Sequence, residues 1–128
     1  KRGIHIEADG VKLYSLEIKG SSGAAIYMTS DNNIIQGCLL TENTYGIIMD
    51  KSEGNRIVLN KIIGNEMAGL HSFKSNENSF LVNEISGNGY GVKLYYSNAN
   101  SFVRCKINEN GEHGIYLLSS DENKFLRC

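Results

Sequence analysis

The sequence repeats itself every 22 or 23 residues. Serine and asparagine mark this period most clearly, because each serine of the repeat is followed three positions later by an asparagine. The two columns are Ser30, Ser52, Ser75, Ser97 and Ser120, and Asn33, Asn55, Asn78, Asn100 and Asn123. A fixed period of this length is the signature of a solenoid, in which each repeat is one unit stacked on its neighbours.

Within each repeat, short apolar segments are separated by residues that favour corners. Two further columns carry asparagine or cysteine: Cys38, Asn60, Asn83, Cys105 and Cys128, then Asn43, Asn65, Asn88 and Asn110. A glycine then precedes a segment in which apolar residues alternate, as in Val92-Lys93-Leu94. Alternation of this kind is typical of a strand with one buried face. Because no segment has room for a helix of ordinary length, the pattern predicts a chain that bends several times per repeat.

We therefore predict an all-β fold, a single-stranded parallel β-helix of about six turns. Equivalent residues of successive turns would stack about 4.8 Å apart, so that inward apolar residues form a core and inward asparagines form amide ladders. The glycine column, which is Gly46, Gly69, Gly91 and Gly114, is expected to supply a positive φ at a corner. A leucine-rich repeat is the alternative, although this sequence has serine where that repeat has its asparagine.

Residues 1–128 are expected to form one solenoid, with 1–24 as a degenerate first turn and 25–128 as regular turns. The net charge of −1 and the scattered charged residues lack the basic stripe that nucleic acid requires. No apolar run is long enough for a membrane span. Since neither end shows a capping repeat, we expect a segment of a longer protein, or flanking domains or partners that cover the ends.

The run Gly-Ile-Tyr-Leu-Leu-Ser-Ser-Asp-Glu-Asn at 114–123, preceded by Ile-Asn-Glu-Asn at 107–110, resembles the NosD-like parallel β-helix repeat family. That grouping includes carbohydrate-binding proteins and sugar hydrolases, and the resemblance covers residues 25–128. It implies a right-handed parallel β-helix in an extracellular, cell-surface or periplasmic protein that binds or acts on polysaccharide. The copper-related role of NosD proteins is not carried over, because no residue cluster matches a metal motif, and no cofactor is expected.

The outward positions of the strand after each glycine form a candidate binding surface. Aromatic rings along a rigid strand face suit the apolar faces of sugar rings, while polar neighbours bind hydroxyl groups. The same rings also fit a purely structural role, since aromatic residues favour strands and pair across them. The candidate ligand-binding residues are Tyr27, His71, Phe73, Lys93, Tyr95 and Tyr116.

These residues favour a non-catalytic or accessory module that presents its strand face to polysaccharide or another surface polymer. One alternative is a fragment of a polysaccharide lyase or glycoside hydrolase, with Asp50, His71 and Lys93 as candidate catalytic residues. A structural spacer or assembly element is the other alternative. An enzyme is the less favoured class, because the charged residues are those of an ordinary solvated surface.

The cysteines and histidines do not predict a metal site. Three cysteines cannot all pair, so buried free thiols are expected, with a bond between Cys105 and Cys128 left open. His5, His71 and His113 are too far apart along the repeat to share a metal ion.

Overall fold

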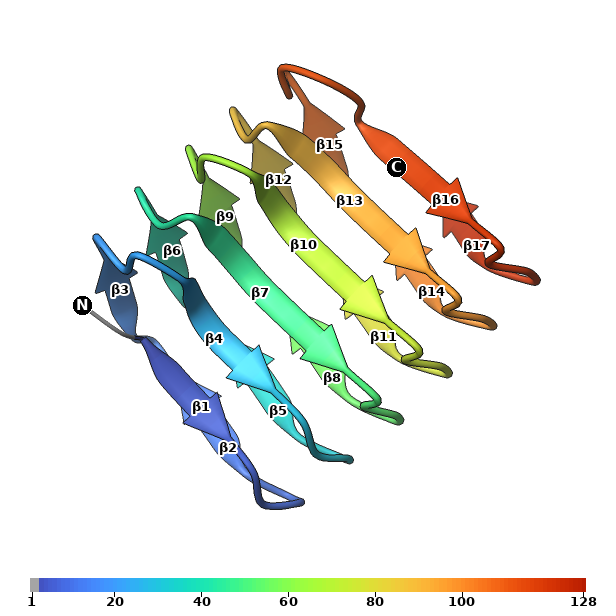
Figure 1. The fold of residues 1–128 in the computed structure, drawn as a ribbon, viewed down its shortest axis with the longest axis horizontal. Helices are drawn as coiled ribbons and strands as arrows, with labels where there is room; N and C mark the ends of the chain where they lie inside the picture. Colours follow the sequence, from blue (N-terminus) through green and yellow to red (C-terminus); the bar gives the residue numbers. More distant parts are fainter. Residues whose placement is uncertain (1–2) are drawn as a thin grey trace.

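The computed structural model describes residues 3–128 and confirms the all-β fold. Every described element is a short strand, and the strands form three parallel sheets, one on each side of a three-sided turn (Figure 1). A leucine-rich repeat would have one strand and a helical segment per repeat. That alternative is therefore wrong, because residues 3–128 contain three strands in most turns and no helix.

Each sheet takes one strand from each turn. Sheet A consists of β1 (Ile4–Ile6), β4 (Ala24–Met28), β7 (Tyr45–Asp50), β10 (Ala68–Phe73), β13 (Tyr90–Tyr95) and β16 (Ile115–Leu118). Sheet B consists of β2 (Lys12–Tyr14), β5 (Ile34–Gln36), β8 (Arg56–Val58), β11 (Ser79–Leu81), β14 (Ser101–Val103) and β17 (Lys124–Leu126). Sheet C consists of β3 (Glu17–Lys19), β6 (Leu39–Thr41), β9 (Lys61–Ile63), β12 (Glu84–Ser86) and β15 (Lys106–Asn108).

The strands pair in the register that the repeat predicts. In sheet A, Ile47 pairs with Leu70, Leu70 with Val92, and Val92 with Ile115. The turns advance from β1 towards β16 while the near strands run from upper left to lower right, so the chain winds in a right-handed sense (Figure 1). The first turn follows the same path although it lacks the asparagine columns, since Ile4 pairs with Ile26.

The core is a stack of inward side chains running along the solenoid axis. Three phenylalanines from consecutive turns lie almost parallel: the ring centroids of Phe80 and Phe102 are 4.2 Å apart, and those of Phe102 and Phe125 are 4.6 Å apart. At the last turn the inward positions are more open, and Ile115 and Leu117 are exposed. The core therefore depends on contacts between turns rather than within a turn.

The expected amide ladders are confirmed. In the column from Asn33 to Asn123, each Oδ1 from Asn55 onwards accepts both the backbone N–H and the Nδ2 group of the preceding asparagine, at 2.8–3.1 Å. The column from Asn43 to Asn110 repeats this arrangement. The ladders thus satisfy buried polar groups that would be costly to leave without partners.

A third column, which we call the middle ladder, has asparagine at its centre and cysteine at its ends. It consists of Cys38, Asn60, Asn83, Cys105 and Cys128. Asn60 and Asn83 occupy its centre, and Nδ2 of Asn60 donates to Oδ1 of Asn83 at 3.1 Å. The three cysteines are free, and Cys38 and Cys105 are buried as expected. Cys128 differs from that expectation, because its place on the last turn leaves it exposed.

The corners place ordinary side chains in the left-handed region of φ. Leu59 and Val82, which immediately precede the buried Asn60 and Asn83, have φ values of 54° and 53°. Such a conformation is strained for a branched side chain, by about 1–3 kcal/mol. The corner turns the next side chain inward, where it forms the ladder hydrogen bonds. These hydrogen bonds offset the strain of the corner residue.

The glycine column is explained by packing, and the expected positive φ is wrong. None of the four glycines has a positive φ. A Cβ atom on Gly69 would lie 2.7 Å from Cγ2 of Ile85, 2.8 Å from Nδ2 of Asn88 and 3.0 Å from the carbonyl oxygen of Gly91. Glycine is therefore required here because the strand passes close to sheet C and to the next turn.

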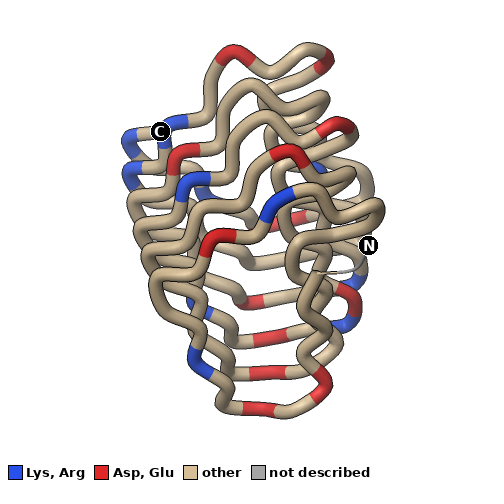
Figure 2. The backbone as a smooth tube through the Cα atoms, turned by 90° about the vertical axis from the view of Figure 1, so that its left-hand side faces the viewer, with Lys and Arg blue, Asp and Glu red and all other residues tan. Residues whose placement is uncertain are grey.

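Acidic and basic residues are both distributed over the turns of the solenoid (Figure 2). Among the described residues, Lys19 forms an ion pair with Glu42, and the His5 imidazole lies against the Glu7 carboxylate. No helix between residues 3 and 128 has the length and apolar character needed to cross a membrane.

Candidate binding face

The outer surface of sheet A brings the predicted ligand-binding residues together. One outward column runs across successive strands of this sheet. Its members, in order, are Tyr27, Ile48, His71, Lys93 and Tyr116. A second column runs beside this one, in which Phe73 pairs with Tyr95. We use the name aromatic face for the outward residues Tyr27, Tyr45, His71, Phe73, Tyr90, Lys93, Tyr95 and Tyr116.

The centre of the aromatic face is a network of edge-to-face rings. The His71 ring lies 5.7 Å from that of Tyr45 and 5.2 Å from that of Tyr95, between centroids. Nζ of Lys93 lies 4.2 Å from the ring centroid of Tyr90 and 5.2 Å from that of Tyr95. Edge-to-face and cation–π contacts hold these side chains in fixed positions. The side chains of this surface are half-buried, and these contacts hold them in place before any ligand binds.

Tyr45 and Tyr90 belong to the aromatic face but were not among the predicted residues. Strict alternation, read backwards from the inward Ile47 and Val92, places both tyrosines inside. In the structure the intervening Gly46 and Gly91 are also inward, so two consecutive residues face the core and the alternation shifts by one. The recurrence of Tyr before Gly at 45 and 90 was the available signal.

His71 is held as a neutral imidazole. Burial lowers its pKa below the ordinary value of about 6.5, and the positive charge of Lys93 lowers it further. Its Nδ1 atom is buried and has no hydrogen-bond partner within residues 3–128. His71 therefore contributes a ring rather than a charge to the face at neutral pH.

The pKa of His71 gives a prediction for stability. Between the lowered pKa in the folded protein and about 6.5, the unfolded chain binds more protons, so the free energy of unfolding rises with pH in that window. We expect stability to fall when the pH is lowered through 6.5, and His71→Phe to reduce this fall. Urea unfolding at pH 7.5 and 5.5 measures the effect. His113→Gln, a change at an exposed histidine, is the control. An identical pH dependence in His71→Phe and the unmodified protein would contradict the assignment.

The three candidate catalytic residues are not joined in one constellation. The hydroxyl of Tyr27 donates to Oδ2 of Asp50 at 3.2 Å, and burial and this carboxylate raise the pKa of Tyr27. Oδ1 of Asp50 is buried without a hydrogen-bond partner in the described part of the chain. Lys93 contacts tyrosine rings instead, and no hydrogen bond or ion pair links Asp50 to His71 or Lys93 within residues 3–128.

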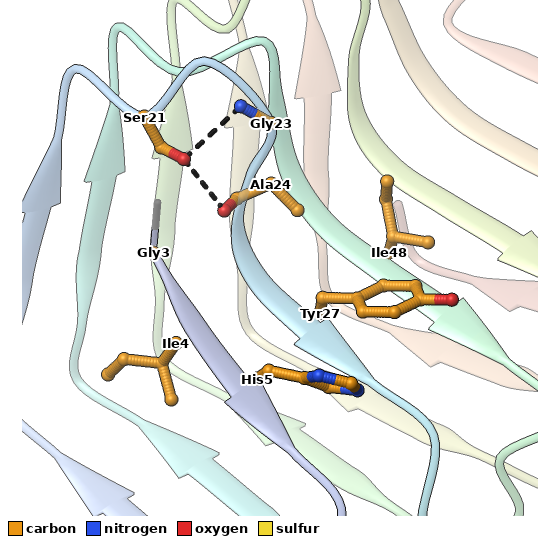
Figure 3. A pocket seen from close by; sticks show the side chains of 8 residues that line it. All are labelled: Gly3, Ile4, His5, Ser21, Gly23, Ala24, Tyr27 and Ile48. Carbon is orange, nitrogen blue, oxygen red and sulfur yellow. Dashed lines mark hydrogen bonds between the residues drawn. The ribbon is translucent and has the colours of Figure 1, made fainter. Parts of the chain in front are cut away.

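A hollow of about 370 Å³ lies where the aromatic face meets the first turn. His5 on β1 and Tyr27 on β4 stand side by side at its edge (Figure 3), with ring centroids 4.7 Å apart. The Nδ1 atom of His5 lies 3.1 Å from Oε1 of Glu7, and Nε2 lies 3.2 Å from Oγ1 of Thr29. These contacts fix the orientation of the imidazole beside the hollow.

Three parallel sheets stacked turn upon turn place the chain in the class of parallel β-solenoid proteins. The model of a family described as periplasmic copper-binding protein (NosD) matches residues 1–127, so the chain belongs to the NosD family. The family resemblance seen in the sequence is thereby confirmed, whereas its extension to carbohydrate-binding proteins and sugar hydrolases stays a prediction. A comparison with curated proteins and one with solved structures each found no match.

The family description raises the question of whether these residues fit copper. Between residues 3 and 128, no three His, Cys, Asp or Glu side chains lie together as metal ligands. A centre with three or more such ligands therefore does not fit the described part of the protein. Cys105 and Cys128 occupy one ladder on adjacent turns, and both are free thiols.

Proposed function

We propose that the chain is a non-catalytic module that binds polysaccharide, or another surface polymer, on its aromatic face. It would act outside the cytoplasm, and the periplasm is the location given in the description of its family. The observation that carries the proposal is the band of ring contacts on sheet A that runs from Tyr45 on β7 through His71 and Tyr95 to Tyr116 on β16.

The dimensions and chemistry of the face support an extended ligand. Six strands at about 4.8 Å spacing give a surface about 24 Å long. Ring contacts continue along it to the last turn, where Tyr95 and Tyr116 lie 5.9 Å apart between centroids. Apolar faces of sugar rings pack on such aromatic surfaces, and a rigid surface loses little conformational entropy on binding.

Replacement of tyrosines tests this proposal. We expect Tyr95→Ala and Tyr116→Ala each to weaken binding of a polysaccharide found on a glycan array, by about 1–2 kcal/mol or roughly 5–30-fold. Tyr27→Ala should weaken it as well. Tyr14→Ala is the matched control, because Tyr14 lies on sheet B and is 50% exposed. A polymer whose binding is equally sensitive to Tyr14→Ala would argue against the aromatic face as its site.

A catalytic function is the second proposal, and one observation favours it. Tyr27 lines the hollow and its hydroxyl donates to Asp50, so a hydroxyl and a carboxylate lie together as a pair suited to proton transfer. A lyase or hydrolase would release sugar, and Asp50→Asn would lower the rate by about 10²–10⁴-fold. A binding module or a structural spacer gives no product in either form.

A further inference from the structure

The aromatic face carries a lysine that is held among tyrosine rings. Lys93 lies on β13, and its Nζ atom is 4.2 Å from the ring centroid of Tyr90 and 5.2 Å from that of Tyr95. The Lys93 side chain is half-buried, and it forms no ion pair within residues 3–128. Aromatic rings attract an ammonium group but do not neutralise its charge. Lys93 therefore presents a positive charge at a defined position on the face.

Two further lysines lie along one edge of the aromatic face. Lys51 and Lys74 directly follow β7 and β10, and both are exposed. The backbone N–H of Lys51 donates to the carbonyl oxygen of Phe73, which precedes Lys74, so the two lysines occupy equivalent positions on adjacent turns. Nζ of Lys74 lies 5.3 Å from the ring centroid of Phe73. Neither lysine forms an ion pair in the described part of the chain, so this edge adds positive charge to the face.

The acidic residues near the outer surface of sheet A lie away from Lys93. Glu7 follows β1 on the first turn, and the Asp50 carboxylate on β7 accepts a hydrogen bond from a tyrosine. Strands β10, β13 and β16 contain no Asp or Glu. Glu66 and Glu112 lie in the turns before β10 and β16, at the far end of these strands from the edge lysines. The part of the face formed by these three strands therefore combines aromatic rings with positive charge.

We propose, on the basis of the polymer-binding function above, that the ligand of the aromatic face is an anionic polysaccharide whose sugar rings carry carboxylate or sulfate groups. The apolar face of a sugar ring packs on Tyr95 and Tyr116, and its acidic group binds the Lys93 ammonium. Since the tyrosine rings already position Lys93, this side chain loses little conformational freedom on binding. A neutral polymer would cover a half-buried ammonium without supplying a counter-charge, so the face discriminates against it.

Binding to matched charged and neutral polymers tests the proposal. Biolayer interferometry measures the affinity of the chain for polygalacturonate and its methyl ester, and for dextran sulfate and dextran. The first pair differs in carboxylate charge and the second in sulfate charge, so the comparison also shows which acidic group is bound. We expect at least one charged polymer to bind about tenfold or more tightly than its neutral counterpart. Sodium chloride at about 0.5 M should weaken that binding several-fold, because salt screens the charges.

Lysine variants locate the acidic group on the face. We expect Lys93→Gln to weaken binding of the charged polymer by about 5–30-fold, and Lys74→Gln by about 2–5-fold because Lys74 is exposed. Lys93→Arg keeps the charge and the ring contacts, so it should retain most of the binding. Lys124→Gln is the matched control, because it removes the same charge from an exposed lysine on sheet B and should leave binding nearly unchanged. Circular dichroism confirms that each variant is folded.

Two results would overturn the proposal. One is that neither charged polymer binds more tightly than its neutral counterpart. The other is that Lys93→Gln and Lys74→Gln weaken binding no more than Lys124→Gln, which would mean that the whole chain, rather than this face, attracts the polymer. A neutral polymer whose binding is lost in Tyr95→Ala and Tyr116→Ala would also overturn the anionic ligand but would support the polymer-binding function. If no polymer of either kind binds, both proposals fail.

Discussion

Asn78→Ala is expected to lower the free energy of unfolding by about 2–6 kcal/mol. Oδ1 of Asn78 accepts the backbone N–H of Asn55 at 2.9 Å and its Nδ2 at 3.0 Å, and Nδ2 of Asn78 donates to Oδ1 of Asn100 at 3.1 Å. Nδ2 also donates to the carbonyl oxygen of Ser52. The alanine variant leaves the buried backbone N–H of Asn55 and the carbonyl oxygen of Ser52 without this partner, and each such group costs about 1–3 kcal/mol. Nδ2 of Asn55 keeps its bond to Ser30, and Oδ1 of Asn100 keeps its bond from the backbone N–H of residue 78. Small domains are stable by only about 5–15 kcal/mol, so this one change removes a large part of the total.

Urea unfolding followed by circular dichroism measures this effect. Asn98→Ala is the control, because Asn98 is also an asparagine in an inter-turn contact but is exposed. Water replaces its hydrogen bonds, so the expected loss is below about 1 kcal/mol. Equal losses in Asn78→Ala and Asn98→Ala would contradict the role assigned to the buried ladder.

Gly69→Ala is expected to cost about 2–3 kcal/mol through overpacking. The added methyl group would lie 2.8 Å from Nδ2 of Asn88 and 3.0 Å from the carbonyl oxygen of Gly91, and neither atom can move without breaking the ladder or the sheet. The cost arises from the packing between turns, because the φ of Gly69 is accessible to any residue.

Gly114→Ala separates this packing effect from a backbone effect. Gly114 occupies the same column, but the nearest atom to its added Cβ would be Cγ2 of Ile107 at an ordinary 3.7 Å. A compatible Gly→Ala change stabilises by about 0.4–1 kcal/mol, by restricting the unfolded chain. Thermal unfolding of both variants checks the contrast. If Gly114→Ala and Gly69→Ala lose comparable stability, the glycine column is required by its backbone conformation rather than by packing.

The repeat predicted the architecture well because equivalent residues are in identical surroundings. Asn55 and Asn78 occupy the same environment one turn apart, so a shared column in the sequence became a shared ladder in space. The serine column behaves likewise, since the backbone N–H of Ser52 donates to Oγ of Ser75. Inter-turn contacts of this kind are visible in sequence once the period is known.

Contacts that cross between columns were not predictable in the same way. The requirement for Gly69 depends on how closely β10 approaches Ile85 of sheet C, which no local pattern reports. Tyr45 was missed because two consecutive inward residues shift the alternation. The bond from Tyr27 to Asp50 is diagonal, and it depends on side-chain conformation as well as register.

The stacking of residues 22 or 23 apart is tested most directly by distances between spin labels. Tyr14 and Leu126 are exposed ends of one aligned column on sheet B, five turns apart. With the native cysteines changed to serine and labels at both sites, we predict a backbone separation of about 24 Å, and a value shorter by about 4.8 Å for Tyr14 with Val103. A broad distribution, or two distances that do not differ by one strand spacing, would contradict the stacked solenoid.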